Sequence, residues 1–332
     1  MSVNSSIPSF GTRIMTFPFG FICDLLEELH SLCLDGKQQR AKDAIRRWFA
    51  THRALINSLG RCGHALLSTL LPDRRTDRVY SIQTNRLEFI IKRSQRLGKQ
   101  RFERLRRYRQ AGVKLDLGDC VQDIWNETWT QHHLRRSQVT IEDIDRLLDG
   151  IAANNKFSSP ALRANKEASG SFQSGDLEGL YARLSPVEAK WFTRLVLKDY
   201  RPVELDESWV LQNYDARLPQ ILKVKDDFFA AMATLQVIND ASLQPGDGTK
   251  VLQYLRPTLG TKVSRVFWRK GRSIKHCLEM GRGRMSVEKK IDGEYCQIHI
   301  DLSRMRARKE QCIQIFSKSG KDSTEDRKGL FG

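Results

Sequence analysis

The sequence lacks the patterns that mark several common classes of protein. No run of about 18 apolar residues is present, so no membrane-spanning helix and no membrane partner are expected. The first residues contain neither the apolar segment nor the cleavage site of a secretory signal peptide. The pattern G-x-x-x-x-G-K-[ST] is also missing, so P-loop nucleotide chemistry is not supported.

Paired cysteines are missing too. The seven cysteines are odd in number, and no two of them form a C-x-x-C pair. This usage is typical of free thiols in a reducing compartment and argues against a zinc finger. No metal site made of protein side chains is therefore predicted.

Positive charge is abundant. Lys and Arg number 56 against 39 Asp and Glu, which leaves a net charge of +17 and a pI near 9.7. Such a balance favours a polyanionic partner, either nucleic acid or an anionic surface. The alternative is a basic face that contacts only solvent. With 40% hydrophobic residues, the 332-residue chain can bury a core in one large domain or two ordinary ones.

The first 240 or so residues have helical periodicity. Thr140 is placed to cap a helix that begins at Ile141 and ends near Asn154. Apolar residues recur at helical spacing in an earlier segment, at Ile22, Leu25, Leu26, Leu29 and Leu32.

A third helix has the clearest start signal. Ser185 is followed by proline at the first helical position and by Glu188, which completes a capping box. The expected buried face carries Val187, Trp191 and Leu195. The segment 157–175 is polar and is expected to be a loop.

Strand periodicity replaces the helical pattern after about Leu255. Residues 295–302 alternate in polarity, and a second extended run covers 312–316, so an antiparallel pair is expected. We place the boundary at the 244–249 linker. The predicted organisation is a mainly α domain at 1–245, followed by an α+β region at 246–332.

Lys290 lies in the run Glu288-Lys-Lys-Ile-Asp-Gly293, which has the form E-x-K-x-D-G. On a strand, Glu288 and Lys290 would point to one face, and Asp292-Gly293 would permit a turn. A lysine attacks phosphorus only when it is unprotonated, so burial, nearby cations or a metal ion must lower its pKa. A divalent ion would also neutralise charge on the leaving pyrophosphate. The alternative is a surface strand that ends in an Asp-Gly turn.

Three segments together carry a resemblance to a known family. They are E-K-K-I-D-G-E at 288–294, I-F-S-K-S-G at 315–320 and L-S-P-V-E-A-K-W-F-T-R-L-V-L-K-D at 184–199. They are similar to segments of the ATP-dependent DNA ligases of eukaryotes, most closely the end-joining (type IV) kind and its fungal relatives. The resemblance spans nearly the whole chain.

The resemblance implies a fold and a set of site residues. The fold would be a helical DNA-binding domain followed by the start of a covalent nucleotidyltransferase (ATP-grasp-like adenylation) domain. Lys290 would be the catalytic residue, would hold AMP as a phosphoramidate, and would use ATP and Mg²⁺. Nucleotide-binding residues would be Glu288, Asp292, Gly293, Tyr295 and Lys318. The family usually has arginine at the last two of these positions. Tyrosine at 295 brings no charge, and lysine at 318 loses the bidentate phosphate geometry of arginine.

The resemblance also implies a biological setting. A ligase of this kind joins nicked or broken DNA duplexes without regard to sequence, in DNA repair, recombination and non-homologous end joining in the nucleus. An end-joining scaffold protein would be a partner. Because further catalytic motifs of the family would follow residue 332, the chain is expected to be a fragment or short form that does not seal nicks by itself.

The segment 86–109 concentrates positive charge, with ten Lys or Arg against two Glu. Its arginines are expected to bind DNA phosphates, as an enzyme that acts on any nick requires. The expected DNA-binding residues are Arg93, Arg96, Arg101, Arg104 and Arg107. The alternative is a solvated helix face whose core side is formed by Leu87, Ile90, Ile91, Leu97, Phe102 and Leu105.

Three other functions use related features. An NAD-dependent ligase or a capping guanylyltransferase can also carry K-x-D-G, but neither is expected to have this helical region before it. A non-catalytic DNA-binding or end-bridging module derived from a ligase is the alternative from a different class. The two replaced arginines favour that module, whereas the retained Glu288, Lys290, Asp292 and Gly293 argue against it.

Overall fold

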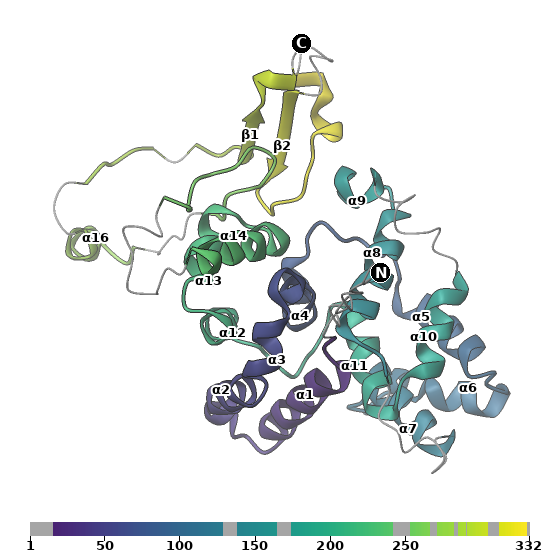
Figure 1. Cartoon of the computed structure of the whole chain (residues 1–332). Coiled ribbons are helices and arrows are strands. Elements are labelled where there is room, and N and C mark those ends of the chain that lie inside the picture. Colours follow the sequence, from purple (N-terminus) through teal and green to yellow (C-terminus); the bar gives the residue numbers. More distant parts are fainter. Residues whose placement is uncertain are drawn as a thin grey trace, which may run out of the picture. The chain divides into compact units, whose positions relative to one another are not determined.

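The computed structural model describes residues 16–128, 138–164, 174–241, 253–265, 271–281, 285–289, 291–304 and 312–330. The chain divides into two compact units, residues 1–214 and residues 215–332. Figure 1 shows their elements along the chain. Among the residues that the structure describes, no helix combines the length and the apolarity that a membrane crossing requires.

Helices are the regular elements in the described part of the first unit (Figure 1). Its α-helices are α1 (Phe19–Leu34), α2 (Ala41–Thr51), α3 (Arg53–Ser58), α4 (Gly63–Leu70), α5 (Thr84–Ser94), α6 (Lys99–Leu105), α7 (Leu117–Thr128), α8 (Ile141–Ala153), α9 (Pro160–Ala164), α10 (Ser174–Arg183), α11 (Pro186–Leu197) and α12 (Glu207–Tyr214). Short 3₁₀ turns are η1 (Gln38–Arg40), η2 (Gly60–Cys62), η3 (Pro72–Arg74) and η4 (Arg107–Arg109).

The predicted helix starts are confirmed for α8 and α11. The Thr140 hydroxyl accepts the Asp143 amide, and the Asp143 carboxylate accepts the Thr140 amide in return. Ser185 and Glu188 form the same reciprocal pair ahead of α11, with the Ser185 amide donating to Glu188 Oε2 at 2.8 Å. These caps satisfy backbone amides that have no partner within the helix.

α11 is buried over more of its surface than its predicted stripe. Trp191 and Leu195 are buried as expected, but Val187 is only half-buried. The helix packs against both α1 and α7, so several neighbouring faces are covered. A helix covered on most sides must place polar residues inside, and Lys190 and Arg194 are buried there.

Other predicted elements of this unit have mixed outcomes. The stripe at Ile22 to Leu29 is buried in α1, whereas Leu32 is half-buried. The segment expected to be a loop contains the short helix α9. α10 begins at Ser174, within the last two residues of that segment, and residues 165–173 lie outside the described residues.

The second unit combines short helices with one small sheet (Figure 1). Its elements are α13 (Leu218–Val224), α14 (Phe228–Asp240), α16 (Ile274–Met280), β1 (Cys296–Ile300), η6 (Leu302–Arg304), β2 (Ile313–Ser317) and η8 (Glu325–Leu330). α13 packs on α14. The predicted antiparallel pair is confirmed, with a register that runs from Cys296 opposite Ser317 to Ile300 opposite Ile313.

The predicted strand at Glu288–Lys290 is not formed in its described part. Residues 285–289 are exposed and have no strand assignment, while Lys290 itself lies outside the described residues. A strand requires a neighbour that accepts its backbone hydrogen bonds, and the described sheet pairs β1 only with β2. The predicted linker at 244–249 also lies outside the described residues, so the boundary at 245 stays a prediction.

Candidate nucleic-acid interface and nucleotide site

The basic segment forms α5, α6 and η4, and its apolar residues face the core. All six residues of the predicted core side are buried, namely Leu87, Ile90, Ile91, Leu97, Phe102 and Leu105. The charged residues of the segment, apart from the buried Glu88, therefore lie on the sides of these helices that face away from the core. Sequence periodicity correctly separated the two faces.

Glu88 is fully buried under this surface and forms ion pairs with two of the arginines of the segment. Arg106 donates to Glu88 Oε2 at 3.0 Å, and Arg109 donates to Oε1 at 2.9 Å. The Tyr108 hydroxyl donates to the same carboxylate at 2.5 Å, and burial together with this bond raises the pKa of Tyr108. A buried carboxylate needs such partners, so these two arginines have a structural role.

Three of the predicted DNA-binding arginines have acidic partners on α7. Arg104 pairs with Glu127, whose other oxygen lies 3.9 Å from Arg101. Arg107 donates to Asp123 at 2.9 Å. The acids are spaced by one helical turn, which brings both beside the arginines. These ion pairs are exposed and screened by solvent, so the arginines can exchange them for phosphate contacts.

The other two predicted residues lie at the end of α5. Arg93 donates to Glu178 of α10 at 2.7 Å. Arg96 is exposed, has a left-handed backbone (φ 48°) and makes no ion pair with any residue of the described part. Arg86, Lys92 and Lys99 likewise have no ion pair with a described residue, and the sequence reasoning did not single them out. The sequence could not show which cations lack a partner, because the acids that pair with the other arginines come from α7 and α10.

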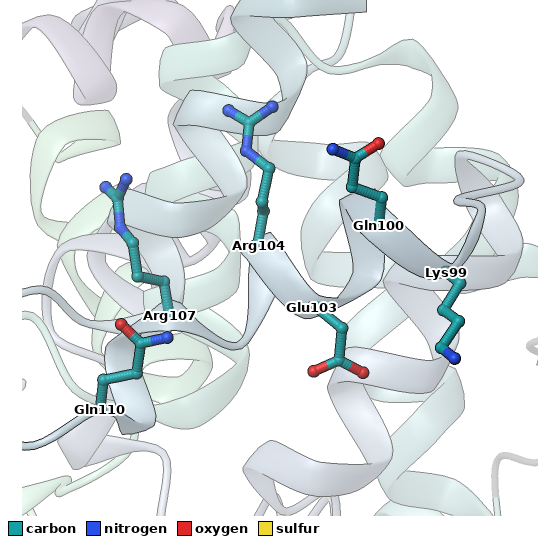
Figure 2. Close-up of a pocket in the computed structure, with 6 residues that line it drawn as sticks. All are labelled: Lys99, Gln100, Glu103, Arg104, Arg107 and Gln110. Atoms are coloured by element: carbon teal, nitrogen blue, oxygen red, sulfur yellow. The ribbon is translucent and has the colours of Figure 1, made fainter.

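An open hollow of about 550 Å³ runs along α6 and η4. Figure 2 shows Arg104 and Arg107 extending to one side of the backbone, while Lys99 and Glu103 extend to the other. The lining residues are Lys99, Gln100, Glu103, Arg104, Arg107 and Gln110. Guanidinium and amide donors in an open groove suit the oxygens of a phosphate backbone.

A second buried charge network supports the helical unit. Arg78 donates to Asp145 at 2.7 Å and to Asp149 at 2.6 Å, with only 1% of its side chain exposed. Burial alone would raise the pKa of Asp145, but Arg78 and a hydrogen bond from His64 hold that pKa well below its usual 3.8. Lys198 donates to the Arg78 carbonyl at 3.0 Å, and burial lowers the pKa of Lys198 to about 8. This network ties α8 and the end of α11 to the segment after α4.

The predicted nucleotide residues of the second unit lie on the surface. Glu288, Asp292 and Gly293 are exposed, and the catalytic candidate Lys290 is outside the described residues. Tyr295 immediately precedes β1, and Lys318 immediately follows β2. Because Cys296 is opposite Ser317, the sheet brings Tyr295 and Lys318 to the same end. The sequence could not supply this register by itself.

The residues at this end offer donors that suit a nucleotide. Lys318 can donate to a phosphate and Tyr295 to a ribose hydroxyl. No group of three or more His, Cys, Asp or Glu in the described ranges could hold a metal ion. Mg²⁺ is commonly held by one or two carboxylates together with substrate phosphates, and Glu288 and Asp292 supply carboxylates near the lysine in sequence.

Residues 1–214 are thus an all-α unit with a buried ionic framework and an arginine-rich surface. The profile of the family described as DNA ligase N terminus matches residues 18–214, more than half of the chain. The chain belongs to this family. The match ends at Tyr214, where the first compact unit also ends.

Similarity to individual proteins extends further along the chain. Two relatives, both named DNA ligase 4, come from Coprinopsis cinerea, one of them from the strain Okayama-7 / 130. Each is 23% identical over 298 residues, which covers 89% of this chain. The chain spans 27% of the length of these curated relatives. The resemblance to ATP-dependent DNA ligases of type IV is thereby confirmed.

Proposed function

We propose that this chain acts in ATP-dependent DNA ligation, with the helical unit bound to duplex DNA and Lys290 as the acceptor of AMP. The match of residues 18–214 to the DNA ligase N terminus carries the proposal. The exposed arginines of α6 and η4 support it, since a protein that joins any nick must grip phosphates rather than read bases. Repair, recombination and end joining in the nucleus, with an end-joining scaffold as partner, belong to the same proposal.

The chemistry proposed for Lys290 is a phosphoryl transfer. The unprotonated amine attacks the α-phosphorus of ATP, a P–N bond forms, and the P–O bond to pyrophosphate breaks. The amine proton is lost to solvent. Mg²⁺ supplies neutralisation of the phosphate charge when it is bound with the triphosphate. Lys318 and Tyr295 flank the same end of the sheet, and this proximity supports a role for both in binding the nucleotide.

Labelled nucleotide tests this step directly. The full chain is incubated with Mg²⁺ and ATP labelled on the α-phosphate, and acid-labile label on the protein is measured after denaturation. Wild type is expected to retain label from ATP, and the label should fall to background in Lys290→Ala. A matched variant, Lys289→Ala, removes the adjacent lysine and should keep the label.

Parallel incubations with NAD and GTP separate the proposal from related enzymes. Label from NAD would indicate an NAD-dependent ligase, and label from GTP a guanylyltransferase. Equal labelling of wild type and Lys290→Ala would show that Lys290 is not the acceptor.

A non-catalytic DNA-binding or end-bridging module is the second candidate. Tyr295 and Lys318 favour it, because both stand where the resembled family usually has arginine. Such a module would still bind DNA, but it would carry no label from any nucleotide. A gel assay of nick sealing with ATP and Mg²⁺ then measures whether joining follows labelling.

A further inference from the structure

Phe89 is an aromatic side chain on the polar side of α5. It is 47% exposed, whereas its neighbours Leu87, Ile90 and Ile91 are buried in the core. A single exposed apolar residue is ordinary in itself. What distinguishes Phe89 is the set of groups that surround its ring.

The ring has a rigid backing. Phe102 lies behind it, with ring centroids 5.5 Å apart and an interplanar angle of 43°. The Arg106 guanidinium is 4.3 Å from the Phe102 centroid and 5.6 Å from that of Phe89. Arg106 is itself held at 3.0 Å by the buried Glu88. The Phe89 ring is therefore supported from one side by groups that are anchored in the core.

Positive charges flank the ring along the helix. Arg86 and Lys92 are three residues before and after Phe89, so they are its neighbours on the helix surface. Neither makes an ion pair with a described residue, and Arg96 beyond them makes none either. Arg86 and Lys92 are separated by about 9 Å along the axis. Lys92 also lies 4.7 Å from the centroid of the Phe102 ring. The surface thus presents a half-exposed aromatic ring between cations that make no ion pair with a described residue.

We propose that Phe89 is a stacking platform for an unpaired base, so that this face binds a single-stranded DNA overhang beside a broken duplex end. Every base has a π-face, and stacking on an exposed aromatic ring needs no particular sequence. Bases inside a duplex have both faces covered by their neighbours, whereas the unpaired bases of an overhang can expose theirs to the ring. Arg86, Lys92 and Arg96 bind the adjacent phosphates. The inference rests on the proposed DNA-binding function and specifies its substrate class.

The test compares two DNAs at one fixed salt concentration, a blunt duplex and the same duplex with a single-stranded overhang. Phe89→Ala is expected to weaken overhang binding about tenfold and to leave blunt-duplex binding unchanged. Phe89→Leu keeps apolar bulk without a π-face and should show most of that loss, whereas Phe89→Trp should bind at least as well as wild type. The fluorescence of a 2-aminopurine in the overhang should change on binding to wild type and should be quenched by Phe89→Trp, and it should change least with Phe89→Ala.

Phe157 provides a matched control elsewhere on the helical unit. It is 52% exposed and has Lys156 4.9 Å from its ring centroid, so it is also an exposed aromatic beside a cation. Phe157→Ala should leave both affinities unchanged. Circular dichroism establishes that each variant is folded.

The outcomes distinguish the two proposals. Equal losses on both DNAs, no loss in Phe89→Ala, or the same loss in Phe157→Ala would overturn the stacking platform and leave duplex binding intact. Failure of wild type to bind either DNA would overturn the DNA-binding function itself.

Discussion

Buried charges hold the helical unit together at the scale of single residues. Arg78 and Glu88 have almost no exposed surface, and each is surrounded by partners of opposite charge. Removing one partner of a buried pair typically costs about 3–5 kcal/mol, because the other charge stays buried. The arginine count of the sequence therefore includes side chains that cannot leave the core to bind DNA.

His64 should make the stability of this unit depend on pH. Burial alone would lower the pKa of His64, and Arg75 acts in the same direction, but the hydrogen bond to Asp145 raises that pKa above its usual 6.5. The stabilisation is fully present below pH 6.5 and is lost as pH rises through the folded-state pKa. Asp145 stays ionised over this range because its pKa is lowered. Urea unfolding at several pH values should show this decline, and His64→Gln should remove it.

His30 serves as the control. Burial and the nearby Lys190 and Arg194 lower the pKa of His30, so its titration affects stability below pH 6.5. His30→Gln should leave the decline above pH 6.5 in place. A decline that persists in His64→Gln would assign the effect to another group.

Capping decides where α11 begins at the scale of elements. The Ser185 hydroxyl accepts the Glu188 amide, and proline follows at the first helical position. Because α11 packs against α1 and α7, weakening its start affects the centre of the unit. Short-range signals of this kind depend on residues three apart, which is why the sequence predicted them correctly.

Ser185→Ala should lower the free energy of unfolding by about 1 kcal/mol, since one backbone amide loses its acceptor. Urea denaturation measures the change. Ser58→Ala at the exposed end of α3 is the matched control and should stay within about 0.5 kcal/mol of wild type. Equal effects of the two substitutions would contradict the capping role.

Strand formation shows the limit of local patterns. The alternation at residues 295–302 predicted β1, and the run at 312–316 predicted β2, each within a residue or two of its observed bounds. A strand was also expected at Glu288, but residues 285–289 have no strand assignment. Pairing depends on a partner that is distant in sequence, and composition does not report it.

Charge is the dominant property at the scale of the whole molecule. A net charge of +17 predicts that DNA affinity falls steeply with salt, by a slope of about 0.9 for each phosphate neutralised. The structure adds that Glu127 on α7 occupies Arg101 and Arg104. Nearby acidic side chains therefore determine how many of these cations are available to bind DNA phosphates.

Glu127→Gln should raise DNA affinity and steepen its dependence on salt, because both arginines are released for phosphate contacts. A plot of log affinity against log salt for wild type and variant measures this. Asp35→Asn changes the net charge equally on an exposed pair with Lys37 and should have a smaller effect. The same shift in both variants would mean that only net charge matters.

The sequence by itself determined the helical class of the first unit, the capped starts of α8 and α11, the buried side of α5 and α6, and the family resemblance. These depend on neighbours within a helical turn or on extended similarity along the chain. Only the tertiary structure decided which of the ten cations in 86–109 are engaged by acids of α7, α10 and the core, and which are left around Phe89. The physical reason is that an ion pair or a ring contact is set by distance in space, and the acids that compensate these arginines are distant from most of them along the chain.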